Sequence, residues 1–339
     1  MKILIIGANG FIGHHLCKRI IENTEWEIHA IDPKSFHLNQ LITHPRFNYL
    51  KGDMTLSAEW ISTTLQRCDV ILPLAGIATP KSYVNDPLGV FELNFEAQLP
   101  IIKQCAKYRK RLIFPSTSEV YGLCEDAHFE PYTSNLIYGP INKSRWIYAT
   151  AKQLIDRIIY AYGEREQLDY TIFRPFNWIG SGQDIQELKS DNSGRVVTQF
   201  LNNILNGTPI TLVNGGKQRR SFTAVNDGID ALMKIITNVD KQASQKIYNI
   251  GNPANNFSII ELANLMIEAA KRRPDLYENA TKVVLQEKKG ESYYGKGYQD
   301  MSHRVPMIQN TCSELNWLPK TSLSESIESI FDTFDNIKI

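Results

Sequence analysis

Short runs of consecutive apolar residues alternate with amphipathic segments through the first half of the chain. The apolar runs predict buried strands, and the segments between them, with apolar residues every three to four positions, predict helices. Strands are expected at 2–7, 26–32, 47–53, 68–76 and 111–117, and a further strand and loop at 170–180. Helices are expected at 11–24, 57–66, 87–109 and 145–167. Because the apolar strands are joined by helices, the pattern predicts a parallel sheet covered on both faces.

The second half of the chain has a weaker strand pattern. Helices near 195–206, 226–238 and 258–271 alternate with short strands at 210–213 and 246–250, and the polar stretch 181–194 predicts a mobile loop. The fold class is therefore α/β, a Rossmann-type doubly wound parallel sheet with a smaller, interleaved α/β substrate-binding cap. We expect the sheet domain to contain residues 1–178 and a returning segment near 214–250. The cap is expected to contain 179–213 and 251–335.

Composition narrows the function classes. The chain has 339 residues, 42% of them hydrophobic, and 37 basic against 36 acidic side chains, which gives a net charge of +1. This balance argues against a nucleic-acid partner but allows a local basic pocket. Five scattered cysteines without a CxxC pair, and the lack of HExxH, predict reduced thiols and no metal site. No apolar run is long enough for a signal peptide or a membrane span, so a cytoplasmic location is expected.

A glycine-rich segment, GANGFIG, follows the first predicted strand and opens the first helix. Its glycines would let backbone N–H groups approach a pyrophosphate at the positive end of that helix. Asp32 lies 19 residues after Gly13, where a carboxylate would bind an adenosine ribose, and it favours NAD over NADP. Asp53 has a second interpretation as a local helix cap. The expected cofactor contacts are Gly7, Asn9, Gly10, Phe11, Ile12, Gly13, Asp32, Asp53, Met54, Leu74, Ala75, Tyr148 and Lys152.

Tyr148 and Lys152 form a Tyr-x-x-x-Lys pair whose spacing places both side chains on one helix face. An ammonium group near a phenol lowers the phenol's pKa, so the phenolate could take a proton from a sugar hydroxyl during its oxidation. Thr117 and Ser118 follow the fifth predicted strand, where either hydroxyl could bind the reacting oxygen or cap the strand end.

These motifs together resemble the extended short-chain dehydrogenase/reductase family, in its nucleotide-sugar-modifying branch. The segments PSTSEVYG, RWIYATAKQLIDR, FRPFNWIG, GGKQRRSFT and SYYGKGYQDMSHR are similar to the UDP-glucuronate decarboxylase domains of bacterial bifunctional polymyxin-resistance enzymes. The similarity runs from about residue 1 to residue 335. It implies oxidation of UDP-glucuronic acid at C4 through Tyr148 and Lys152, with NAD as the acceptor. The C6 carboxylate would then leave as CO₂, giving a UDP-4-keto-pentose and NADH.

The resemblance also implies further roles. Glu119 and Arg304 match the remaining catalytic positions, with Arg304 as a carboxylate clamp or proton donor. Arg174, Arg220 and Arg304 would offer cations to a dianionic sugar nucleotide. A homodimer through the helices near 87–109 and 145–167 is expected. The implied catalytic set is Thr117, Ser118, Glu119, Tyr148, Lys152 and Arg304, and the implied substrate-binding set is Asn177, Arg195, Thr211, Arg220, Tyr298 and Arg304.

Several alternatives stay open. A UDP-xylose synthase or an apiose/xylose synthase would return the hydride to the bound intermediate, and a UDP-glucuronate 4-epimerase would keep the carboxylate. From a different class, a non-catalytic NAD-sensing regulator would be expected to lose the Tyr-x-x-x-Lys pair. Thr211 stands where the decarboxylases carry a lysine, so individual substrate contacts are expected to differ. Ser118 and Ala78 stand where the apiose-forming enzymes carry cysteines, which argues against ring contraction.

Overall fold

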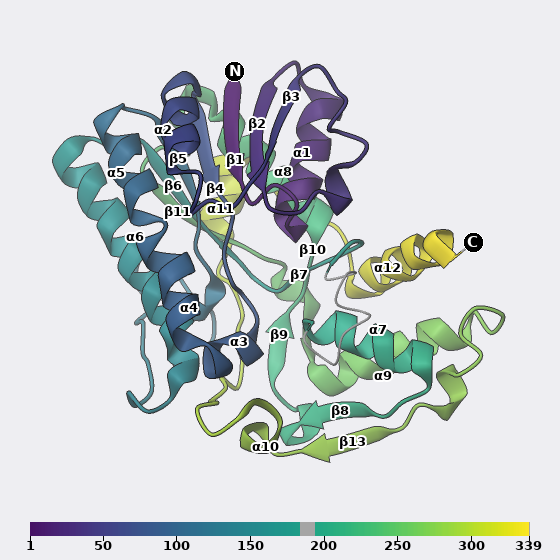
Figure 1. The fold of residues 1–339 in the computed structure, drawn as a ribbon. Coiled ribbons are helices and arrows are strands. Elements are labelled where there is room, and N and C mark those ends of the chain that lie inside the picture. The colour runs from purple at the N-terminus through teal and green to yellow at the C-terminus, as the bar shows by residue number, and fades with distance from the viewer. Residues whose placement is uncertain (184–193, 339) are drawn as a thin grey trace.

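The computed structural model describes residues 1–183 and 194–338 (Figure 1). Its centre is a seven-stranded sheet in the order β11-β6-β5-β4-β1-β2-β3, and every neighbouring pair is parallel. The strands are β1 (Lys2–Ile6), β2 (Glu27–Asp32), β3 (Phe47–Lys51), β4 (Val70–Pro73), β5 (Arg111–Pro115), β6 (Tyr170–Pro175) and β11 (Lys246–Ile250). The order reverses beside β1, so the predicted Rossmann-type, doubly wound sheet is confirmed.

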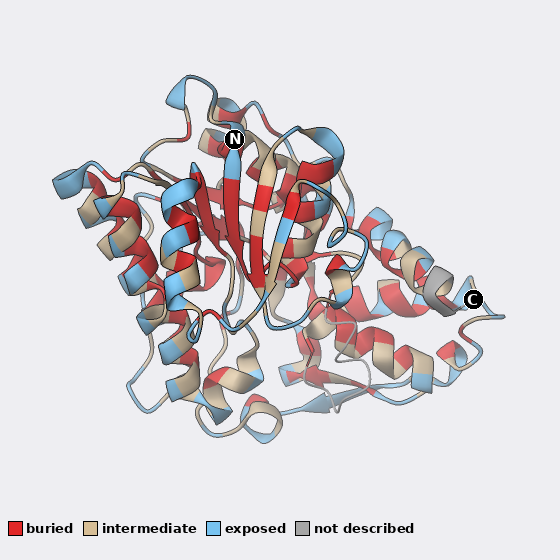
Figure 2. Cartoon of the chain, turned by 45° about the horizontal axis from the view of Figure 1, so that its top comes forward, coloured by how far each residue is buried: buried red, intermediate tan, exposed pale blue. Residues whose placement is uncertain are grey.

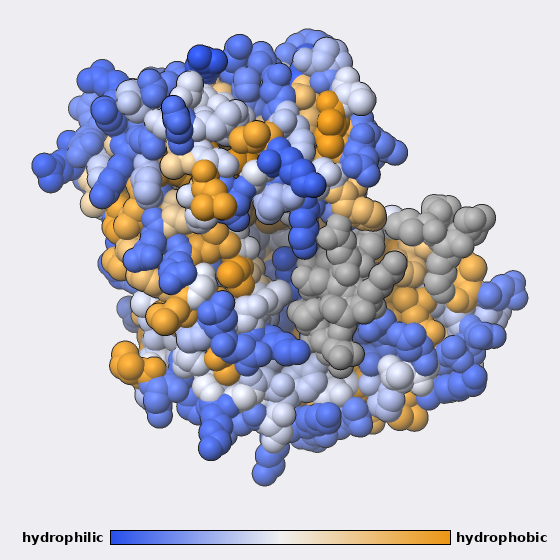
Figure 3. All heavy atoms as spheres, viewed as in Figure 1, coloured by the Kyte–Doolittle hydropathy of each residue, from blue (hydrophilic) through white to orange (hydrophobic). Residues whose placement is uncertain are grey.

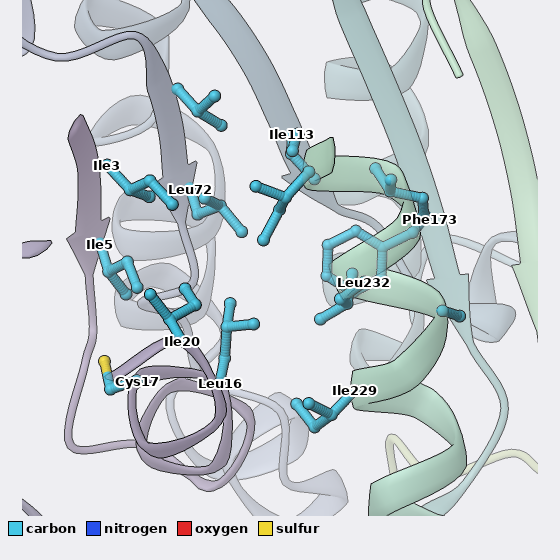
Figure 4. Close-up of a cluster of buried hydrophobic side chains, with 14 of the residues drawn as sticks. Ile3, Ile5, Leu16, Cys17, Ile20, Leu72, Ile113, Phe173, Ile229 and Leu232 are labelled. Carbon is cyan, nitrogen blue, oxygen red and sulfur yellow. The ribbon is translucent and has the colours of Figure 1, made fainter. Parts of the chain in front are cut away.

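Side chains from alternate positions of each strand fill two separate cores, one on each face of the sheet. Ile3 and Ile5 of β1 point into the first core, which Figure 4 shows, and Leu4 and Ile6 point into the second. The helices over the first core are α1 (Phe11–Asn23), α8 (Val225–Thr237) and α11 (Gln309–Leu315). Those over the second are α2 (Ala58–Arg67), α5 (Leu99–Lys107) and α6 (Ile147–Glu166). Burial of both faces, red in Figure 2, explains why the central strands β1, β4 and β5 are apolar at nearly every position.

The helix expected at 87–109 is present, but it is not a regular α-helix along its whole length. The segment contains α4 (Pro87–Phe91), a π-helical stretch η2 (Glu92–Glu96) and then α5. Pro100 lies in the first turn of α5 and has no N–H to donate to the preceding turn, so the α-helical hydrogen bonds are interrupted there although the backbone stays helical. The buried Asn94 amide donates to Val90 O (2.9 Å) and Ile77 O (3.1 Å), which ties the widened stretch to the loop after β4.

A second group of elements lies beyond the carboxyl edge of the sheet (Figure 1). Its helices enclose a core of their own that includes Phe200, Met266 and Phe331. The helices are α7 (Val196–Asn206), α9 (Ile259–Lys271), α10 (Gly290–Tyr294) and α12 (Leu323–Lys338), and the short α3 (Pro80–Asn85) lies before α4. Three two-stranded sheets join them: β7 (Trp178–Ile179) with β10 (Thr223–Ala224), β9 (Arg219–Ser221) with β12 (Asn256–Ser258), and β8 (Ile210–Val213) with β13 (Leu285–Lys288).

Three further expectations concern the cysteines, membrane-spanning helices and the polar stretch 181–194. All five cysteines are free, and four of them are buried. Among the described residues, no helix combines the length and the apolarity that crossing a membrane requires. Most of the stretch 181–194, for which a mobile loop was expected, lies outside the described residues.

Candidate active site

Two cavities meet at the carboxyl edge of the sheet, where ligands bind in open α/β folds. The sheet-edge cavity lies over the glycine segment and the ends of β4, β5 and β6, and the cap cavity lies between this edge and α7, β8 and α10. Residues that line both are Ala78, Glu119, Asn177, Trp178, Arg195 and Arg304. A ligand that extends from one cavity into the other would therefore pass the Glu119–Arg304 pair.

Most of the residues expected at the site line one of these cavities. In the sheet-edge cavity lie Gly7, Gly10, Phe11, Ile12, Gly13, Leu74, Thr117, Ser118, Glu119, Tyr148, Lys152, Asn177, Arg195 and Arg304. In the cap cavity lie Glu119, Asn177, Arg195, Thr211, Arg220, Tyr298 and Arg304. Five expected cofactor contacts line neither cavity: Asn9, Asp32, Asp53, Met54 and Ala75.

The glycine segment has the shape that a bound pyrophosphate needs. Gly7 has a φ of +87°, and a Cβ there would come within 2.5 Å of the backbone nitrogen of Ala75. A Cβ on Gly13 would collide with the carbonyl oxygen of Gly7. Helix α1 begins at Phe11 without a side-chain cap, so the N–H groups of its first turn are left to an anion in the cavity.

Asp32 is held at the end of β2 beside this segment. Its carboxylate accepts from the backbone N–H groups of Asn9 (3.0 Å) and Lys34 (2.9 Å), and burial raises its pKa above the ordinary value. Asp53 instead accepts from the backbone N–H (2.8 Å) and hydroxyl (2.6 Å) of Thr55 in a local turn. It is not a helix cap, because α2 begins at Ala58 with Ser57 at its N-cap position. The glycine turn and Asp32 together fit a dinucleotide.

Tyr148 and Lys152 lie in the first two turns of α6 and are both buried. The Lys152 ammonium donates to the carbonyl oxygen of Pro115 (2.9 Å), at the end of β5. Burial lowers the pKa of Lys152 to about 8, while Asp156 acts in the opposite direction. The other tyrosines near this helix are differently placed: Tyr138 donates to Val120 O (2.9 Å), and Tyr160 is exposed.

The pKa of Tyr148 differs from the sequence-based expectation. Burial and the negative charge of Glu119 raise it above the usual value of 10, while a hydrogen bond with Thr117 and the charges of Arg195 and Arg304 act to lower it. The expected lowering of the Tyr148 pKa is therefore wrong for the protein without a bound cofactor, because the effect of burial is larger than the effect of the nearby positive charges.

Glu119 lies between two buried arginines at the junction of the cavities. One oxygen accepts from Arg304 Nη2 (3.1 Å) and the other from Arg145 Nη1. Arg304 also donates to the Ser118 hydroxyl (3.2 Å). Burial acts to raise the pKa of Glu119, but Arg145 and Arg304 outweigh it and hold this pKa at about 2. The three ionised groups carry a net charge of +1 in a space that excludes most water.

Two of the other arginines expected to hold a dianionic ligand already have partners. Arg174 is wrongly placed in that group: it is buried and donates to Asp156 (3.0 Å) and to the Tyr121 hydroxyl (3.0 Å). Arg220 does line the cap cavity, but it is paired with Asp300 (2.6 Å), so that pair adds no net charge. A buried arginine is usually paired with a nearby carboxylate. The sequence shows the arginine but does not show which carboxylate lies beside it in the fold.

Arg145 and Tyr83 were missed in the sequence. The Tyr83 ring stacks on the Tyr148 ring with centroids 4.6 Å apart and an angle of 8° between the planes. Arg145 has a detectable signal, because it precedes Tyr148 by three residues and Lys152 by seven, the spacing of one helix face. Tyr83 lies on the short helix α3, which no periodic pattern predicts.

Comparison with known proteins identifies the family and the fold. Residues 3–251 match the NAD dependent epimerase/dehydratase family. The PbgP3 protein from Burkholderia pseudomallei is 51% identical, with a TM-score of 0.90 over 99% of this chain and 96% of that one. A Bacillus cereus UDP-glucuronic acid 4-epimerase, solved with UDP-glucuronic acid and NAD, is 21% identical, with a TM-score of 0.83 over 99% of this chain and all of that one.

A Thermotoga maritima UDP-glucose 4-epimerase, solved with UDP-glucose, is also 21% identical, with a TM-score of 0.82 over 100% of both chains. At this identity the two epimerases establish a shared fold. The family match covers more than half of the chain and confirms NAD as the cofactor, which the glycine turn and Asp32 fit. The chain therefore belongs to the NAD-dependent epimerase/dehydratase family, the extended short-chain dehydrogenases/reductases to which its motifs pointed.

Proposed function

We propose that this enzyme oxidatively decarboxylates UDP-glucuronic acid, with NAD⁺ as the oxidant, to a UDP-4-keto-pentose, CO₂ and NADH. The observation that carries the proposal is the cluster of Glu119, Arg145 and Arg304 at the junction of the two cavities. A substrate whose reacting end carries one carboxylate would neutralise the net charge of +1 on this cluster. A sugar with a neutral C6 hydroxyl would leave the second arginine without an anion.

The groups around Tyr148 suit removal of a proton from the sugar 4-hydroxyl. Thr117 is hydrogen-bonded to Tyr148, so the two hydroxyls can contact one substrate oxygen. With a pKa of about 8, Lys152 is mainly protonated at pH 7, and its positive charge favours the phenolate. When bound, NAD⁺ supplies the two-electron acceptor for C4 and a further positive charge beside the phenol.

Oxidation at C4 makes the C6 carboxylate that of a β-keto acid, which loses CO₂ because the electrons left behind delocalise into the ketone. Thr117 and Tyr148 can donate hydrogen bonds to the enolate oxygen that forms. Arg145 and Arg304 hold the carboxylate until the bond between C5 and C6 breaks. C5 then takes up one proton, which balances the proton removed from the 4-hydroxyl.

The cap cavity is suited to the nucleotide half of the substrate. Phe200 and Tyr298 offer aromatic surfaces and Thr211 a hydroxyl, while Asn177 and Arg195 lie at the junction where a diphosphate would pass. The two epimerase structures described above contain UDP-sugars, which supports the same class of ligand here. On this basis we assign the sugar nucleotide to the expected cap segments, 179–213 and 251–335.

We also propose that the enzyme forms a homodimer through α4, α5 and α6. Large apolar side chains on these helices face outward: Leu88 is 70% exposed, Leu154 43% and Tyr160 48%. Figure 3 shows apolar atoms gathered over this side of the sheet domain. An apolar surface of this kind on a soluble enzyme is typical of a contact between subunits.

The decisive experiment is to incubate the purified protein with UDP-glucuronic acid and NAD⁺ and to identify the products by mass spectrometry. We expect a UDP-4-keto-pentose and one NADH for each sugar consumed, and no reaction with UDP-glucose. A UDP-pentose without net NADH would indicate internal return of the hydride, and UDP-galacturonic acid would indicate an epimerase. An unchanged sugar would refute the proposal.

A further inference from the structure

A buried carboxylate outside both cavities lies on α6, the helix that carries Tyr148 and Lys152, and contacts Ser116 after β5 and Arg174 of β6. Asp156 follows Lys152 by one turn of α6, and only 4% of it is exposed. Its Oδ2 accepts from the Ser116 hydroxyl (2.8 Å) and from Arg174 Nη2 (3.0 Å) and Nε (3.3 Å). Its Oδ1 has no hydrogen-bond partner within the described residues, so the group is costly to bury and is not explained by ordinary packing.

Asp156 and Lys152 each hydrogen-bond to one of two consecutive residues, the last residue of β5 and the residue after it. Lys152 donates to the Pro115 carbonyl oxygen (2.9 Å), and Asp156 accepts from the hydroxyl of Ser116, the next residue. Thr117, which hydrogen-bonds to Tyr148, follows directly. A shift of Asp156 would therefore change the position of the ammonium group and of the threonine hydroxyl together.

The same network reaches the segment that carries Arg304. Arg174 donates to the Tyr121 hydroxyl (3.0 Å), which in turn donates to Asn249 Oδ1 (2.7 Å). The Asn249 amide donates to the carbonyl oxygen of Phe129 (2.7 Å). Backbone hydrogen bonds then join Phe129 to residues 305 and 307, on the carboxyl side of Arg304. All of the side chains in this path are buried.

We infer that Asp156 is a positioning residue of the reaction: with Ser116 and Arg174 it fixes the Lys152 ammonium against β5 and keeps the Arg304 segment in register with the catalytic helix. The inference rests on the oxidation step of the proposed function and not on the decarboxylation. The charged and titratable groups that face Asp156 are Lys152 on its own helix, Arg174 on β6 and Tyr138 in the loop before α6.

The charge of Asp156 supports this role. Burial lowers the pKa of Lys152, and Asp156 is the group that opposes this effect. Without the carboxylate, Lys152 would lose its proton at a lower pH, and its charge would no longer favour the phenolate of Tyr148. A carboxylate too distant to act on the ammonium group would leave the titration of Lys152 unchanged.

The test compares Asp156→Asn with Asp227→Asn. Asp227 is also a buried carboxylate (6% exposed), but its partners are the backbone N–H groups of Lys320 and Thr321 and the Thr321 hydroxyl, and it lines neither cavity. Carbon NMR of lysine labelled at the ε position follows the Lys152 titration without substrate. In Asp156→Asn we expect its midpoint to fall by about one pH unit. Asp227→Asn should leave the midpoint unchanged.

Activity provides the second measurement. Asp156→Asn should lower kcat by about 10- to 100-fold with little change in KM, and move the alkaline limb of the kcat profile to lower pH. If this variant does not fold, Ser116→Ala removes one hydrogen bond and keeps the charge of Asp156; it should lower kcat by a smaller factor, and an unchanged kcat would overturn the inference. An unchanged Lys152 midpoint in the folded variant would overturn the inference. A wild-type enzyme that is inactive on UDP-glucuronic acid would refute the proposed function but not the NMR result.

Discussion

Replacing Glu119 with glutamine would leave Arg145 and Arg304 facing each other across a neutral amide. The side chain keeps its shape, so the change removes one negative charge between two buried positive charges. The net charge of the cluster rises from +1 to +2. Two measurable consequences follow, one for stability and one for ligand binding.

The size of the stability change follows from the pKa of Glu119. The two arginines hold it at about 2, against an ordinary value of 4.5. At about 1.4 kcal/mol for each pKa unit, this difference is roughly 3 kcal/mol of stabilisation at neutral pH. Because the folded pKa lies below the unfolded one, the contribution is present above pH 4.5 and is lost as the pH falls through about 2. About 2 kcal/mol would remain at roughly pH 3.5.

Urea denaturation of the wild type and of Glu119→Gln at both pH values provides the assay. The free energies of unfolding should differ by roughly 3 kcal/mol at pH 7, and the difference should shrink by about 1 kcal/mol at about pH 3.5. Glu25→Gln, in a side chain that is 94% exposed, is the matched control and should change stability by less than about 0.5 kcal/mol at either pH.

Ligand binding tests the same cluster independently. With a net charge of +2, Glu119→Gln should bind UDP-glucuronic acid more tightly relative to UDP-glucose than the wild type does, as measured by calorimetry. A stability difference that does not depend on pH, together with an unchanged preference between the two sugars, would refute the reasoning about this cluster.

Three further changes test other parts of the site. Tyr148→Phe should keep sugar-nucleotide binding but lower kcat by about 10²- to 10⁴-fold, whereas Tyr160→Phe on the same helix should retain full turnover; equal rates for both variants would exclude Tyr148 as the base. Gly13→Ala places a Cβ against the Gly7 carbonyl oxygen and should weaken NAD binding at least about tenfold by fluorescence titration, with unchanged affinity counting against the glycine turn. Leu154→Glu adds a charge to the exposed face of α6 and should yield a monomer by light scattering; a persistent dimer would place the interface elsewhere.

The sheet was predictable because its strands are buried on both faces. Strand β1, for example, is apolar at each of its last four positions, and its neighbour β4 is apolar throughout. Strand β13 was not predictable, since Leu285–Lys288 is exposed at every position and carries a single apolar residue. The π-helical stretch in the predicted helix at 87–109 was missed because the apolar spacing continues through it, while Pro100 was the available sign of an interruption.

The sequence motifs predicted which side chains lie at the candidate active site, but not which carboxylates pair with its arginines. The Tyr-x-x-x-Lys pair and the glycine segment line the sheet-edge cavity as expected. Arg174 was wrongly expected to bind the ligand, and Arg145 was missed. The reason is that a buried structural arginine and a ligand-binding arginine cannot be distinguished by sequence alone. What distinguishes them is a carboxylate brought in from another element: Asp156 for the first and Glu119 for the second. Such pairings depend on the tertiary fold.

The path of the chain near β11 has a consequence for dissection of the protein. Strand β11 completes the edge of the large sheet, yet β9 before it and β12 after it pair with each other outside that sheet. No single cut between these elements separates the sheet from the cap without exposing strand edges that are now paired. A fragment ending near residue 251, where the family match ends, would lose the partner of β9. The two halves are therefore expected to unfold in one cooperative transition, and not to be expressed as independent modules.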